Sequence, residues 1–120
     1  MESLRIAVAD DESDMREFLQ KALERLGHQV LGPAENGLEL IELCKHQQPD
    51  LIITDIRMPE MNGDDALKEI LAVRTIPYIV ISAFGAPKAE KNLQHPDSVC
   101  LDKPVRMHDL KLAIDQICSS

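Results

Sequence analysis

The sequence predicts a doubly wound α/β fold, a parallel sheet of five strands with helices on both faces. Short apolar runs alternate with stretches whose apolar residues recur every three or four positions, the pattern of alternating strands and helices. The runs at 51–54 and 78–82 are apolar without alternation, which is typical of strands covered on both sides. A chain of 120 residues with 44% hydrophobic content can build one ordinary core, so we expect one domain over residues 1–120.

The first half of the chain contains two strand and helix pairs. Apolar residues at 4, 6 and 8 predict a strand that the acidic run at 10–14 ends. An apolar stripe from Met15 to Leu26 predicts a helix that Gly27 stops, as glycine often does. Residues 28–34 are a short strand candidate. Asn36, followed three residues later by Glu39, has the pattern of a capping box that opens a second helix.

The second half repeats the alternation three times. The apolar run at 51–54 is followed by the helix-breaking segment MPEMNG, and the run at 78–82 follows Pro77. The remaining expected elements are a helix marked by residues 66–71, a weak helix near 88–93, a short last strand at 98–101 and a helix over 107–117. Connections of this kind are right-handed, which places helices on both faces of the sheet.

Polar side chains stand at the carboxyl ends of four of the expected strands. Asp10 and Asp11 follow the first strand, Asp55 the third, Ser82 the fourth and Lys103 the fifth. Ligands of such sheets bind at this edge, so these side chains should converge. Carboxylates brought to about 4 Å repel by roughly 4 kcal/mol per pair, so three of them need a cation. Oxygen ligands without nitrogen or sulfur predict Mg²⁺.

The same constellation predicts phosphoryl chemistry at Asp55. A carboxylate beside a metal ion and a lysine can attack phosphorus, because both cations neutralise charge on the transferring oxygens. Asp55 would then be a covalent phosphoacceptor, Lys103 would contact the phosphoryl group, and the Ser82 hydroxyl could donate a hydrogen bond to it.

Composition limits the partners. A formal net charge of -8 disfavours direct contact with nucleic acid or with an anionic membrane surface. No stretch approaches the roughly 20 apolar residues of a membrane span, and the N-terminus lacks the layout of a signal peptide, so we expect a cytoplasmic protein. Cys44, Cys100 and Cys118 fit neither a disulfide framework nor a Cys-x-x-Cys metal site.

The motifs RIAVADDE, DLIITDIRMPEMNG, YIVISA and LDKP together resemble the receiver domain of bacterial two-component response regulators, which are CheY-like. The resemblance implies strand order 2-1-3-4-5, phosphorylation at Asp55, and Mg²⁺ held by Asp10, Asp11, Asp55 and the backbone carbonyl of Arg57. It also implies that Ser82 is the switch hydroxyl and Lys103 the phosphate contact, with a cis bond from Lys103 to Pro104. No separate substrate turnover is expected, so the protein is not an enzyme in the usual sense.

The resemblance further implies a histidine kinase or phosphotransfer protein as donor and a downstream output domain or protein as target. It also implies a possible homodimer through the fourth helix (near 88–93), the fifth strand (98–101) and the fifth helix (107–117). One position departs from the pattern: three residues before Lys103, where the family usually has Tyr or Phe, the chain has Cys100. We interpret Cys100 as a buried cysteine that cannot act as a large rotating switch, which puts the usual readout in question.

Three other functions compete with this interpretation. A phosphatase with an aspartate nucleophile would need Asp-x-Asp at one strand end, but Asp55 is followed by Ile56 and Arg57. A flavin-binding domain would need a Ser/Thr/Gly phosphate loop after the first strand and aromatic residues around the ring, and neither is present. A degenerate receiver that acts as a phosphorylation-independent interaction module stays open because of Cys100.

Overall fold

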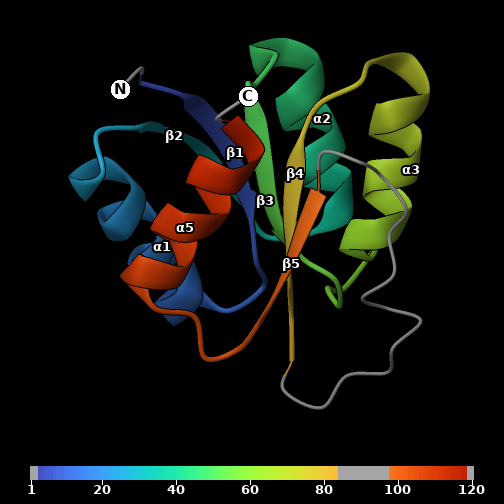
Figure 1. Ribbon diagram of the computed structural model, residues 1–120. Helices are drawn as coiled ribbons and strands as arrows, with labels where there is room; N and C mark the ends of the chain where they lie inside the picture. The colour runs from blue at the N-terminus through green and yellow to red at the C-terminus, as the bar shows by residue number, and fades with distance from the viewer. Residues whose placement is uncertain (1–2, 84–97, 119–120) are drawn as a thin grey trace.

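The computed structural model describes residues 3–83 and 98–118, and within them the chain forms one parallel sheet flanked by helices (Figure 1). The strand order is β2-β1-β3-β4-β5, with every neighbouring pair parallel, so the predicted doubly wound fold is confirmed. The helix expected near 88–93 lies outside the described residues. The elements are β1 (Arg5–Ala9), α1 (Ser13–Arg25), β2 (Gln29–Ala34), α2 (Gly37–Gln47), β3 (Leu51–Asp55), α3 (Gly63–Val73), β4 (Tyr78–Ser82), β5 (Ser98–Asp102) and α5 (Met107–Cys118).

Helices cover both faces of the sheet. One core cluster joins Ile6 and Val8 of β1 to apolar residues of α1 and α5. The other joins Ala7 and Ala9 to α2 and α3. Successive side chains of a strand point to opposite faces, so β1 contributes to both cores, its larger residues to one and its alanines to the other. In Figure 1, α1 and α5 lie together on one side of the sheet, and α2 and α3 on the other.

Local signals in the sequence account for two helix ends. Gly27, with φ of +94°, follows α1; its N–H donates to Glu24 O, and the N–H of His28 donates to Leu23 O. This is a Schellman motif, which needs a residue that tolerates left-handed backbone. At the start of α2, the side chain of Asn36 accepts a hydrogen bond from the Glu39 N–H at 2.9 Å, as predicted. The Glu39 carboxylate, however, accepts from the N–H of Glu35 rather than from that of Asn36.

Burial differs between the central strands and β5. Every residue of β3 and β4 is buried, as their unbroken apolar runs predicted. β5 is an outer strand of the sheet; three of its residues are half-buried, and Cys100 and Asp102 are exposed. Our interpretation of Cys100 as buried was therefore wrong. Within residues 3–83 and 98–118, no helix combines the length and the apolar character needed to cross a membrane.

Candidate metal and phosphoacceptor site

Four carboxylates converge at the carboxyl ends of β1 and β3. Asp10, Asp11 and Glu12 follow β1, and Asp55 is the last residue of β3. Each offers an oxygen within 4.8 Å of those of the other three. Asp10 and Asp55 are buried, whereas Asp11 and Glu12 are exposed. The cluster is therefore open to solvent on one side and closed by the sheet on the other.

Asp10 is the most deeply buried of the four, with 0% of its surface exposed. Its Oδ1 accepts a hydrogen bond from the Glu12 N–H at 2.9 Å, but its Oδ2 has no hydrogen-bond partner. The nearest cation to that oxygen is Lys103, whose Nζ lies 3.4 Å away as an ion pair. Burial raises the pKa of Asp10, and the Asp55 carboxylate adds to the rise. A buried carboxylate oxygen without a donor is costly unless a cation compensates it.

Asp55 is held by its own backbone and by Lys103. The Ile56 N–H donates to Asp55 Oδ1 at 2.8 Å, and Lys103 Nζ donates to Oδ2 at 3.1 Å. Burial raises the pKa of Asp55, and Lys103 opposes the rise. Both oxygens are thus oriented before any ligand arrives, with Oδ2 toward the cluster's lysine.

Lys103 reaches the cluster from the end of β5. Its Nζ lies 2.9 Å from Glu12 Oε1, in addition to its contacts with Asp55 and Asp10. Burial alone would lower the pKa of Lys103, but the three carboxylates outweigh burial and raise it, so this amine is a fixed positive charge. One ammonium against four carboxylates leaves a formal charge of -3 at the site. The Lys103–Pro104 peptide bond is cis, as the resemblance implied.

The start of α3 packs closely against Asp55. A Cβ on Gly63 would overlap the backbone oxygen of Asp55 and approach Thr54 Oγ1 to 2.9 Å. The Gly63 N–H donates to Ile56 O at 2.7 Å, which fixes this close approach. Only glycine lets the first turn of α3 pack directly on β3. Arg57 lies in the loop between β3 and α3 with an exposed side chain, and the role of its carbonyl as a metal ligand stays a prediction.

Ser82 ends β4 and is buried. Its hydroxyl donates to Asp102 Oδ1 at 3.0 Å and lies 3.9 Å from the sulfur of Cys100. The Lys103 N–H donates to Ser82 O at 2.8 Å, so the backbones of the predicted switch serine and lysine are joined directly. The hydroxyl is thus engaged with β5 in this structure.

Two residues of the site were not predicted as members of it. Glu12 makes the shortest of the ion pairs with Lys103, and Asp102 accepts the hydrogen bond from the Ser82 hydroxyl. The parallel register of β4 and β5 pairs Ser82 with Asp102, so a prediction of that register would have found it. Glu12 carries a weaker signal, as the third of three consecutive acidic residues at the end of β1.

Comparison with known proteins identifies the fold family. The family model of the response regulator receiver domain matches residues 6–115. The chain belongs to this family. The receiver is 34% identical over 112 residues to the transcriptional regulatory protein PdtaR of Mycobacterium tuberculosis, covering 92% of the chain and 55% of that protein. It is 43% identical over 82 residues to the chemotaxis protein CheY of Thermotoga maritima, covering 68% of each.

Solved structures agree with this assignment. A receiver domain protein from Clostridium thermocellum superposes with a TM-score of 0.80 at 31% identity, covering 94% of this receiver and 92% of that chain. The anti-anti-sigma factor PhyR from Bartonella quintana superposes with a TM-score of 0.82 at 29% identity, covering 97% of this receiver but 48% of that chain. The receiver thus spans about half the length of PdtaR and PhyR. Receiver domains are mostly signalling modules, although some relatives are protein-glutamate methylesterases.

Proposed function

We propose that this receiver accepts a phosphoryl group on Asp55 from a histidine kinase or phosphotransfer protein, in a reaction that requires Mg²⁺. The observation that carries the proposal is a cluster of four carboxylates with excess negative charge. In it, hydrogen bonds orient the Asp55 carboxylate, and one buried oxygen of Asp10 has no hydrogen-bond partner. An all-oxygen donor set with a charge deficit suits a hard divalent ion. Asp10, Asp11, Asp55 and the backbone carbonyl of Arg57 would hold it.

Asp55 is the nucleophile in the proposed step. Its carboxylate oxygen forms a bond to phosphorus as the bond from phosphorus to the donor's imidazole nitrogen breaks, and the imidazole leaves with that electron pair. Mg²⁺, when bound, neutralises charge on the phosphoryl oxygens. Lys103, already within 3.1 Å of Asp55, would stabilise the same oxygens from the side of β5.

Ser82 and Lys103 would couple the phosphoryl group to a partner surface. The Ser82 hydroxyl would exchange Asp102 for a phosphoryl oxygen, and Lys103 would loosen its contact with Glu12. Both exchanges act on β5 and its flanking loops, because Asp102 and Lys103 are consecutive in the chain. We propose that the downstream output domain or protein, or a second copy of the receiver, binds the face of β5 and α5 together with the helix expected near 88–93.

Further parts of the proposal rest on composition and family membership. They are a single domain over residues 1–120, a cytoplasmic location and the absence of direct nucleic acid contact, the last because of the net charge of -8. No separate substrate turnover is part of the proposed activity.

The test is phosphorylation by acetyl phosphate, followed by intact mass spectrometry with and without Mg²⁺. We expect one added phosphoryl group in the wild type with Mg²⁺, none without the metal and none in Asp55→Asn. Asp65→Asn, which removes an exposed carboxylate from α3, is the matched control and should be phosphorylated normally. A folded wild type that gains no phosphoryl group would overturn the proposal and favour a phosphorylation-independent interaction module.

A further inference from the structure

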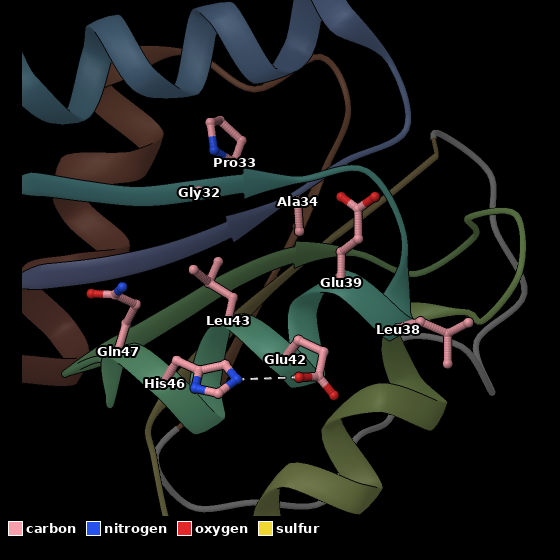
Figure 2. A pocket seen from close by; sticks show the side chains of 9 residues that line it. All are labelled: Gly32, Pro33, Ala34, Leu38, Glu39, Glu42, Leu43, His46 and Gln47. Carbon is pink, nitrogen blue, oxygen red and sulfur yellow. Dashed lines mark ion pairs between the residues drawn. The ribbon is translucent and has the colours of Figure 1, made fainter.

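An open groove runs between the edge strand β2 and helix α2 (Figure 2). It has a volume of about 470 Å³ and shares no lining residue with the acidic cluster. Its apolar surface comes from Gly32, Pro33, Ala34, Leu38 and Leu43, and Figure 2 shows the Leu43 side chain directed from α2 toward β2. The volume falls within the roughly 300–1,000 Å³ of ligand pockets.

A glycine keeps the two walls of the groove at their present separation. Gly32 has φ of +91°, and a Cβ there would lie 2.9 Å from both Leu43 Cδ2 and Ala34 N. Any other residue would strain the strand and push Leu43 away. Gly32 is also exposed, so β2 presents a bare stretch of backbone at the edge of the sheet.

The groove is bordered by acidic side chains. Glu39 and Glu42 line it, and no lysine or arginine is among its described lining residues. Glu39 uses one oxygen to accept from the Glu35 N–H. Glu42 is 64% exposed; its carboxylate lies 3.3 Å from His46 Nε2, the pair dashed in Figure 2, and 3.9 Å from Lys45 Nζ.

An apolar side chain reaches solvent beside these carboxylates. Leu38, at the start of α2, is 47% exposed and lines the same groove as Leu43. Apolar surface bordered by carboxylates is complementary to a segment that carries an apolar side chain next to lysine or arginine. A second copy of this chain, with a net charge of -8, is a poorer match, as is any acidic ligand.

We propose that the groove between β2 and α2 docks a segment of a partner protein that inserts an apolar side chain against Leu38 and Leu43 and places a lysine or arginine beside Glu42. This surface shares no residue with β5 or α5 and does not depend on phosphorylation of Asp55. It would let the receiver hold one partner while the phosphorylation site engages another.

The test is selection from a random peptide library displayed on phage, with the purified, unphosphorylated chain as target. Selected peptides are synthesised, and their binding is measured by fluorescence anisotropy and mapped by amide chemical shifts. Two variants change the groove, Leu38→Asp and Glu42→Lys. Each has a matched control at an exposed position elsewhere: Val73→Asp on α3, where the valine is 90% exposed, and Glu24→Lys on α1.

The expected peptides carry an apolar residue beside lysine or arginine and shift amides of β2 and α2. Leu38→Asp and Glu42→Lys should each weaken binding by about tenfold or more, and the two controls by less than about twofold. Amide spectra of the free variants verify that they are folded. The proposal is overturned if selection yields no peptide that depends on Leu38, if the peptides are acidic, or if the controls weaken binding equally. Self-association of the chain that Leu38→Asp abolishes would also overturn it, by assigning the groove to a second copy.

Discussion

Replacing Asp10 by Asn should stabilise the metal-free protein. At 3.4 Å, with an effective dielectric near 20, Lys103 attracts the Asp10 carboxylate by about 5 kcal/mol. Asp55, with an oxygen within 4.8 Å, repels it by at least about 3 kcal/mol, and the exposed Asp11 and Glu12 add about 1 kcal/mol each after solvent screening. These contributions cancel. What is left is the desolvation of a buried carboxylate, which costs several kcal/mol. It is reduced by the roughly 1 kcal/mol by which the Glu12 N–H binds a charged oxygen more strongly than an amide oxygen.

The expected gain for Asp10→Asn is therefore about 2 kcal/mol, because the asparagine keeps an acceptor for the Glu12 N–H and turns an amide donor toward the other carboxylates. Urea unfolding in EDTA should show a midpoint about 1 M higher than in the wild type. Glu24→Gln, an exposed change on α1, should move the free energy of unfolding by less than about 0.5 kcal/mol. A midpoint for Asp10→Asn at or below that of the wild type would refute this account of the cluster.

Magnesium should reverse the ranking. A ligand that binds only the folded state at about a hundred times its Kd stabilises that state by about 2.7 kcal/mol, which exceeds the gain expected from Asp10→Asn. We expect that gain in the wild type and its loss in Asp10→Asn. Equal stabilisation of both proteins by Mg²⁺ would show that Asp10 is not part of the metal site.

Three further predictions concern the scaffold. Gly63→Ala should lower the free energy of unfolding by about 1–3 kcal/mol in urea, since its methyl group would overlap the backbone oxygen of Asp55; an unchanged midpoint would contradict the packing. Asn36→Ala should cost about 1 kcal/mol by removing the cap of α2, and a loss of helix stability smaller than about 0.3 kcal/mol would contradict it. Burial lowers the pKa of His28, whose Nδ1 accepts a hydrogen bond from the Leu4 N–H, so the unfolded chain binds a proton more readily than the folded chain. The free energy of unfolding should therefore fall as the pH drops below about 6.5. His28→Gln should lessen that fall when unfolding is measured between pH 8 and pH 5.

The sequence was most informative where a short local pattern is enough to determine the structure. The unbroken apolar run before Asp55 predicted a strand covered on both faces, and β3 is buried throughout. Gly27 predicted the end of α1 because its φ of +94° is open to few other residues. The alternation of strands and helices then brought the carboxyl ends of β1, β3 and β5 to one edge, where Asp10, Asp55 and Lys103 do meet.

The sequence was less informative where the outcome depends on neighbours distant in the chain. The implied strand order did place the fifth strand at the edge of the sheet, but the apolar residues at 98–101 do not show which of its side chains reach solvent, and Cys100 is exposed. The contact of Lys103 with Glu12 depends on the reach of two long side chains rather than on spacing. The partner of Ser82, Asp102, follows from strand register, which was not predicted.

The measurement that most directly tests the central claim is the position of the phosphoryl group. After reaction with acetyl phosphate and Mg²⁺, borohydride would reduce an aspartyl phosphate to homoserine, with release of phosphate. Cleavage after Lys45 and Arg57 gives the peptide HQQPDLIITDIR, which contains both Asp50 and Asp55. Asp50 is therefore an internal control for the specificity of the modification. We predict homoserine at position 55 and an intact Asp50. Homoserine at any other carboxylate, or none in a protein that is folded and metal-bound, would contradict the account.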